Sequence, residues 1–345
     1  MTKARPTDTA PSPAPLIWYA RCPTLTALGL IANRGVLQRE FLRENVHLVS
    51  VRENSTPSVR QGHLDHTLPN LIREADAATA LWAHGQNERS RLLAVGQTWH
   101  TISIVTRPGQ SIQSLSDLAG RRLSLIKEAG NFSPAQVRSL RAWETVLEVA
   151  GVAKTDIEFV PVVADHPSVP FGDVARREVE AVLSGHTDVA ILFGAKGLEL
   201  VRSAHLKTVH RFTPEEIKAD ARLSGLVELR AVTVDSVLLE GRADIVTRIL
   251  DNLVEAARWA ERFPNEAIRQ AAIEGKVELE DAVTAYGSLL TEGAQIGIDS
   301  SRLSTLAGLA DWLKHRHLLP SAHRLDDWLA PAPLQKVQDG LSAYA

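Results

Sequence analysis

Apolar runs and amphipathic stretches alternate along the first part of the chain. LIWYA at 16–20 and VHLVSV at 46–51 have the uninterrupted apolar pattern of buried strands. The apolar spacing of TLTALGLIANRGVL at 24–37 predicts a helix that begins just after Pro23. We expect a polar loop after the second strand and then a short helix at 68–75.

The alternation is most regular in the middle of the chain. SIQSLSDLAGRRLSLI at 111–126 predicts a short capped helix, a glycine-centred turn and a strand, which is a common opening of an α/β unit. Predicted helices follow at 134–151 and 172–184, and predicted strands at 157–162, 188–193 and 226–234. Parallel strands need crossover connections, so this order favours a mostly parallel sheet with helices on both faces. From Ala243 onward the pattern is almost wholly helical.

The length of 345 residues is too great for one ordinary core and fits two lobes with a cleft between them. Two strand-like runs, LLAVG at 92–96 and TISIVTR at 101–107, flank a turn where the lobes would connect. We expect a disordered tail at 1–15, a discontinuous first lobe at 16–107 and 229–345, and a second lobe at 108–228.

Composition narrows the class of protein. A formal net charge of −3 disfavours binding to nucleic acid or to an anionic membrane. No run approaches the roughly 18 to 20 apolar residues that a bilayer span needs, and residues 1–15 lack a signal-peptide core, so we expect a cytoplasmic protein without membrane insertion. The single cysteine, Cys22, excludes an intrachain disulfide and a cysteine-cluster metal site.

Four polar residues are candidates for chemistry. Cys22 falls in a strand-to-helix turn, where a helix N-terminus lowers a thiol pKa, although a lone cysteine is more often a small buried apolar residue. His63 and His66 form an HxxH pair without an evident third ligand, so we predict no metal site. Arg73, on the predicted short helix, is either a surface charge or a fork for an anion.

The fold is indicated by a resemblance. The pattern at 111–125 and GHTDVAIL at 185–192 look like the second lobe of type II periplasmic-binding-protein folds, in which a helix ends in glycine and a strand beginning with aspartate follows. The resemblance implies a two-lobed α/β fold with the ligand cleft between the lobes.

A narrower resemblance covers nearly the whole chain. ARCPTLTALGLIANRGVL at 20–37, SIQSLSDLAGRRLSL at 111–125 and LAGLADWLKHRHLLPSAHRLDDWLAP at 306–331 are together similar to the 2'-hydroxybiphenyl-2-sulfinate desulfinase family. That family has the binding-protein fold but consists of intracellular enzymes. Its members use a cysteine after the first strand, a histidine in the loop after the second, and an arginine ten residues beyond that histidine.

Carried over to this chain, the resemblance assigns a catalytic centre of Cys22, His63 and Arg73. The ten-residue spacing is retained, but Ala75 and Asp76 stand where the family has two glycines against the sulfinate. An acidic Asp76 beside an anion is unfavourable unless it points outward or pairs with a cation.

The resemblance implies roles for these residues. Arg73 would hold the sulfinate, and His63 would orient Cys22 and share its proton. Cys22 would either protonate the ring carbon as sulfur leaves or attack the sulfinate sulfur as a thiolate. Neither route requires a metal or an organic cofactor.

Further residues are predicted to bind the substrate. Some of them flank the catalytic residues, two lie in the turn between the connecting strands, and two end a second-lobe strand where ligands of open α/β sheets bind. They are Pro23, His66, Asp76, Trp99, His100, Asn131, Phe193 and Gly194.

Two functions remain open. The first is a desulfinase-like hydrolase that releases sulfite from an aromatic or other organic sulfinate. The second is a non-catalytic solute-binding protein of the ABC-transporter type for an organic sulfonate, sulfinate or carboxylate. Either would be a monomer or dimer with a small organic anion as its partner. The self-sacrificing chemistry of thiamine-pyrimidine synthases, a third possibility, finds no iron-site pattern.

Overall fold

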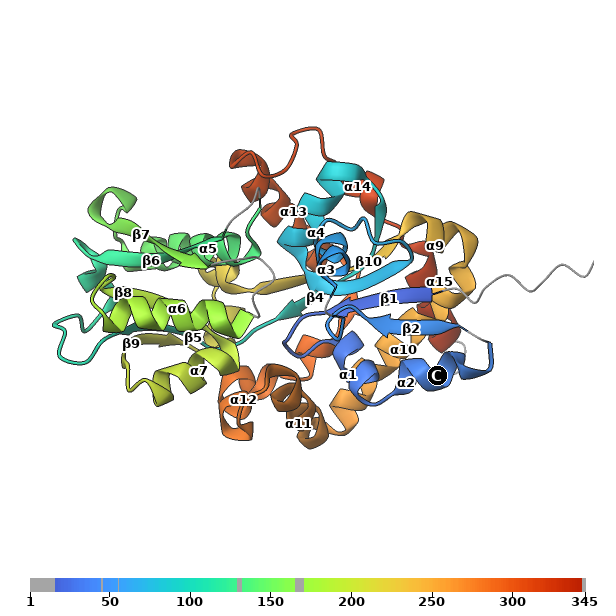
Figure 1. Ribbon diagram of the computed structural model, residues 1–345, viewed down its shortest axis with the longest axis horizontal. Helices are drawn as coiled ribbons and strands as arrows, with labels where there is room; N and C mark the ends of the chain where they lie inside the picture. The colour runs from blue at the N-terminus through green and yellow to red at the C-terminus, as the bar shows by residue number, and fades with distance from the viewer. Residues whose placement is uncertain (1–15, 45, 55, 129–131, 165–170, 343–345) are drawn as a thin grey trace, which may run out of the picture.

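Two separate β-sheets divide the chain into two lobes (Figure 1). The computed structural model describes residues 16–44, 46–54, 56–128, 132–164 and 171–342. The first sheet has the strand order β11-β4-β10-β3-β1-β2, and the second has the order β7-β6-β8-β5-β9. This arrangement confirms the predicted two-lobed fold.

The first lobe combines the two ends of the described chain. Its strands are β1 (Leu16–Arg21), β2 (His47–Ser50), β3 (Leu71–Asp76), β4 (Ser90–Thr98), β10 (Glu228–Asp235) and β11 (Ile296–Gly297). Its helices from the N-terminal part are α1 (Ala27–Asn33), α2 (Val36–Phe41), α3 (Pro57–Leu64) and α4 (Ala77–Asn87). Those from the C-terminal part are α9 (Ser236–Gly241), α10 (Ala243–Arg262), α11 (Pro264–Gly275), α12 (Leu279–Tyr286), α13 (Ser300–His315), α14 (Leu325–Trp328) and α15 (Ala332–Ser342).

The second lobe is built from the middle of the chain. Its strands are β5 (Ile102–Thr106), β6 (Arg122–Glu128), β7 (Glu158–Ala164), β8 (Val189–Phe193) and β9 (Lys207–Phe212). Its helices are α5 (Pro134–Ala150), α6 (Phe171–Leu183), α7 (Gly194–Ser203) and α8 (Pro214–Ala219). As the sequence pattern predicts, β6 is parallel to both β7 and β8, whereas β5 is antiparallel to β8 and β9.

The chain crosses between the lobes at residues 99–101 and again just before β10. Because β5 pairs only with strands of the second sheet, residues 102–106 lie in the second lobe, whereas the sequence pattern placed everything up to 107 in the first. The two apolar runs that flank the first crossing look alike, so their composition does not tell which sheet each one joins.

The predicted short helix at 68–75 is wrong, because residues 71–76 form the central strand β3. Leu71 and Ile72 are buried between β1 and β10, and strand pairing on both sides outweighs the helical spacing of the segment. Part of the polar segment that was expected to be a loop after the second strand is instead the helix α3, which begins at Pro57. Only Gly62 in it is buried, so the helix has no apolar stripe to reveal it.

The two faces of the first sheet are covered by different helices. Tyr19 and Ile72 pack into the core formed with α1 and α10, whereas Ala20 and Leu71 face Val59 of α3. No helix among the described ranges is both long and apolar enough to cross a membrane.

Candidate functional site

Cys22 continues the pairing of β1 with β3 by one residue. Its backbone N–H donates to the carbonyl oxygen of Glu74 at 3.2 Å. Since Ala20 pairs with Arg73 and side chains alternate along a strand, Cys22 and Arg73 lie on the same face of the sheet. The sulfur of Cys22 accepts a hydrogen bond from the backbone N–H of Asp76, the residue that precedes helix α4. The helix whose N-terminus lies next to the thiol is therefore α4, and not the helix that follows Pro23 in the sequence.

The thiol of Cys22 is held in its protonated form. Burial, together with the carboxylates of Glu228 and Asp76, raises its pKa from 9.0 to about 12, against smaller opposite effects of Arg230 and the Asp76 N–H. The expectation of a lowered thiol pKa is therefore wrong. The sequence pattern does not reveal the two carboxylates that fold against the cysteine.

Arg73 is fully buried in β3 and keeps part of its guanidinium unpaired. Its Nη1 donates to the carbonyl oxygens of His63 at 2.6 Å and Leu64 at 3.1 Å, at the last turn of α3. Its Nε and Nη2 have no hydrogen-bond partner among the described residues. Burial lowers the pKa of Arg73 to about 10, and the charge of Asp76 opposes that shift. Nε and Nη2 form one edge of the guanidinium, which fits two oxygens of an anion.

His63 contacts Arg73 through its backbone. Its ring Nδ1 donates to the carbonyl oxygen of Arg60 at 2.5 Å. Burial and the nearby charge of Arg73 lower the pKa of His63 to about 4, so the ring is neutral at physiological pH. In the described part of the chain it makes no hydrogen bond to Cys22. The expected Cys-His contact is thus absent from this arrangement.

His66 lies behind the site rather than in it. Its side chain is fully buried, with Nε2 3.1 Å from Oγ1 of Thr233 on β10. Burial and the charge of Arg73 lower the pKa of His66 well below its usual value. The described residues contain no group of three metal-ligating side chains around the HxxH pair or elsewhere.

Asp76 caps helix α4. Its Oδ2 accepts from the backbone N of Thr79 at 2.8 Å and from Oγ1 of Thr79 at 2.7 Å. Burial raises the pKa of Asp76. Asp76 stands where the desulfinase family has a glycine, and its carboxylate is stabilised here by these hydrogen bonds rather than by an ion pair with a cation.

A buried carboxylate that the sequence did not single out joins the lobes. Oε2 of Glu228 lies 3.0 Å from Nε2 of His100 and accepts from Nη2 of Arg138 at 3.3 Å, while Oε1 accepts from Oγ1 of Thr24 at 3.3 Å. Although burial alone would raise it, Arg138 and His100 hold the pKa of Glu228 well below its usual range. Glu228 thereby ties the segment after Cys22 to α5 of the second lobe. The available signal was a carboxylate at the start of a strand that is otherwise largely apolar, with Arg230 two residues further on.

Phe193 and Gly194 adjoin this cluster, as predicted for the end of a second-lobe strand. The guanidinium of Arg138 lies 4.2 Å from the ring centroid of Phe193. Gly194 has a positive φ of 59° and lies against the ring of His100, where a Cβ would be 3.7 Å away. Trp99 is turned instead to Lys218, whose Nζ lies 5.4 Å from the Trp99 ring.

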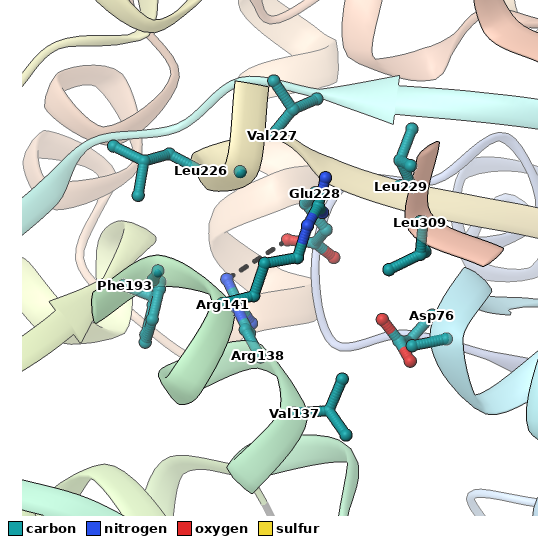
Figure 2. A pocket seen from close by; sticks show the side chains of 13 residues that line it. Asp76, Val137, Arg138, Arg141, Phe193, Leu226, Val227, Glu228, Leu229 and Leu309 are labelled. Carbon is teal, nitrogen blue, oxygen red and sulfur yellow. Dashed lines mark hydrogen bonds and ion pairs between the residues drawn. The ribbon is translucent and has the colours of Figure 1, made fainter. Parts of the chain in front are cut away.

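A pocket lies between the lobes, and Figure 2 shows its side chains. It is lined by Asp76, Ala78, Val137, Arg138, Arg141, Ala142, Phe193, Gly225, Leu226, Val227, Glu228, Leu229 and Leu309. Of the predicted site residues, Asp76 and Phe193 line it. Cys22 and Arg73 do not line it, but both are close enough to Asp76 for its charge to change their pKa values. Pro23 is exposed. Asn131 lies outside the described residues.

Comparison with known proteins agrees with the sequence resemblance. No family model matches the chain. The 2'-hydroxybiphenyl-2-sulfinate desulfinases of Rhodococcus erythropolis and Rhodococcus qingshengii are each 23% identical to it over 348 aligned positions, which cover 91% of this chain and 91% of each relative.

Solved structures show the same fold. A mutant of DSZB in complex with biphenyl-2-sulfinic acid has a TM-score of 0.78 at 21% identity, covering 94% of this chain and 99% of that one. The periplasmic aliphatic sulphonate binding protein SsuA of Escherichia coli has a TM-score of 0.63 at 12% identity, covering 91% and 92%. The chain is thus similar in sequence to the 2'-hydroxybiphenyl-2-sulfinate desulfinases, and it has the fold that DSZB shares with sulfonate-binding proteins.

Proposed function

We propose that the protein is a desulfinase-like hydrolase that releases sulfite from an organic sulfinate at the site of Cys22 and Arg73. One observation carries the proposal. Arg73 is buried, has two donors without partners among the described residues, and lies on the same face of the first sheet as Cys22. The sequence likeness to the Rhodococcus desulfinases supports the choice of a sulfinate as the anion.

The protonated thiol favours one of the two mechanisms. Because its pKa is raised to about 12, the Cys22 thiol is protonated at pH 7, which favours a role as proton donor over one as nucleophile. In the proposed step the S–H proton goes to the carbon that bears sulfur. The carbon–sulfur bond breaks and its electron pair stays with that carbon, so the sulfinate leaves as sulfur dioxide.

The remaining steps restore the enzyme. Water adds to sulfur dioxide to give bisulfite and a proton, and that proton returns to the Cys22 thiolate. The sum is one sulfinate and one water converted to one hydrocarbon and one bisulfite. Arg73 binds the two sulfinate oxygens through Nε and Nη2, while the carbonyl oxygen of His63 holds the guanidinium in place.

The test is sulfite release from benzenesulfinate and alkyl sulfinates by the wild type and by Cys22→Ser. We expect sulfite from the wild type only, with both proteins shifting their melting temperature when sulfinate is added. A surface variant, Arg222→Met, serves as the control because, among the residues that the structure describes, that side chain pairs only with the neighbouring Asp220. Equal sulfite release by Cys22→Ser would contradict the proposed role of the thiol.

The alternative of a binding protein rests on two observations. SsuA proteins share the fold, and the thiol of Cys22 lacks the lowered pKa of an activated nucleophile. A binding protein would release no sulfite from any sulfinate, and its affinity for sulfinate or sulfonate would be the same in the wild type and Cys22→Ser.

A further inference from the structure

Two arginines of α5 line the interlobe pocket from the second lobe. Arg138 and Arg141 are three residues apart, which places them on one face of the helix. Figure 2 shows both extending toward Glu228, with Phe193 on one side and Asp76 on the other. The second lobe therefore presents cationic groups to the same cleft.

The arginines around the cleft differ in their counter-ions. Arg138 pairs with Glu228 at 3.3 Å, and Arg230 pairs with Glu74 at 3.3 Å. Arg141 forms no ion pair within the described part of the chain, and its hydrogen bond there is from Nη2 to the carbonyl oxygen of Ser224 at 3.3 Å. Burial lowers the pKa of Arg141 to about 10.

Asp76 forms no ion pair with Arg141. Its charge acts on Arg141 only from beyond ion-pair distance, and its carboxylate accepts hydrogen bonds from Thr79 at the N-terminus of α4. Removing a guanidinium from water without a carboxylate partner is costly, and an anionic ligand group removes that cost. Arg141 therefore has the surroundings of a ligand-binding residue.

Arg141 lines the interlobe pocket and Arg73 lies beside it, close to Asp76, and neither arginine forms an ion pair among the described residues. The pocket wall includes the apolar side chains of Val137, Phe193 and Leu309 as well as the carboxylates of Asp76 and Glu228. This arrangement suits a hydrocarbon body with an anionic group at each end.

We infer that the substrate is an organic sulfinate that also carries a carboxylate, with the sulfinate on Arg73 and the carboxylate on Arg141. The inference rests on the proposed function for the sulfinate end, whereas the carboxylate end rests on Arg141 alone.

The first test uses the wild type. Sulfite release is compared between benzenesulfinate and the 2-, 3- and 4-sulfinobenzoates, which move the carboxylate around the ring. We expect kcat/KM for at least one sulfinobenzoate to exceed that for benzenesulfinate by about tenfold or more, because hydrogen bonds to charged groups are strong. Benzenesulfinate equal to or better than all three isomers would overturn the inference.

Variants of Arg141 test whether this residue causes the higher kcat/KM for a sulfinobenzoate. Arg141→Met should bring the ratio of the two kcat/KM values close to one, and Arg141→Lys should retain part of the preference. Arg222→Met, an exposed arginine paired with Asp220, should leave the ratio unchanged. A full preference in Arg141→Met would assign the carboxylate to another residue and overturn the inference.

Binding separates this inference from the desulfinase proposal. Calorimetry with benzenesulfonate and the sulfobenzoates, which we use as uncleaved analogues, measures the second anion without turnover. Tighter binding of a sulfobenzoate that depends on Arg141 would support the carboxylate site even if no sulfinate were cleaved. Equal binding of all the sulfonates would overturn it even if sulfite were released.

Discussion

Arg73 donates from Nη1 to the backbone carbonyl oxygen of His63 at 2.6 Å, so the two residues meet through the main chain of α3. The imidazole of His63 is neutral, with a pKa of about 4. The carbonyl of Leu64 accepts a second bond from the same nitrogen at 3.1 Å. The end of α3 therefore fixes the orientation of the guanidinium and leaves its Nε and Nη2 for an anion.

This geometry predicts that lysine cannot replace Arg73. An ammonium group is a point charge and cannot present two parallel donors to a sulfinate. We expect Arg73→Lys to lower kcat/KM for sulfinate by about a hundredfold, measured by sulfite release. The matched control is Arg222→Lys, and thermal melting of each variant checks the fold. Activity within a few-fold of the wild type would remove Arg73 from the site.

The fold was accessible from the sequence because its signals are local. The capping box at Ser114 and Asp117 and the glycine turn at Gly120 are formed by neighbouring residues, and both occur as the pattern indicates. The strand β3 was missed because the burial of its charged residues depends on distant partners. Glu74, for example, is held by Arg230 of β10 and by the backbone N–H of Leu28.

The site was predicted only in part, because its geometry also depends on residues that are distant in the sequence. The cysteine and arginine are separated by 51 positions, yet they share one face of the sheet through the register of β1 and β3, which a sequence does not display. Glu228 and Arg138 come from a later strand and from the other lobe. The charge around Cys22, and hence the raised pKa of its thiol, depends on how the lobes meet.

The carboxylate of Glu228 provides a direct test of that environment. Cys22 is the only cysteine of the chain, so alkylation by iodoacetamide reports on it alone. Because Glu228 raises the pKa of the thiol, Glu228→Gln lowers that pKa and increases the thiolate fraction at a given pH. We expect alkylation at pH 8 to be about threefold to tenfold faster than in the wild type.

The control for this change is Glu144→Gln, which removes a half-buried carboxylate bonded to Lys154 and Trp312. Opening of the lobes would also speed alkylation, but it would do so equally at every pH. A lowered pKa instead moves the inflection of the rate profile to lower pH. An unchanged inflection in Glu228→Gln would show that its charge does not act on the thiol.

A pair of histidines predicts acid sensitivity of the first lobe. Nδ1 of His84 on α4 lies 2.9 Å from Nε2 of His323, in the segment before α14, and both side chains are buried. Burial and the neighbouring His323 lower the pKa of His84 from 6.5 to about 4, and burial also lowers that of His323. Two imidazolium rings cannot share this contact.

Because folding lowers the pKa values of both histidines, acid should reduce the stability of the folded state. Above pH 6.5 both rings are neutral in the folded and unfolded chain, so their contribution to stability is complete. As pH falls from 6.5 toward 4, the unfolded chain takes up protons first and the folded state loses stability. For His84 we expect a loss of about 1 kcal/mol at pH 5, discounted for partial exposure.

The measurement is the free energy of unfolding by urea at pH 7.5 and pH 5, compared between the wild type and His84→Gln. The variant should lose less stability between these pH values, because glutamine does not titrate, while His186→Gln, at an exposed histidine, should behave as the wild type. The same loss in His84→Gln as in the wild type would mean that acid destabilisation originates at other groups.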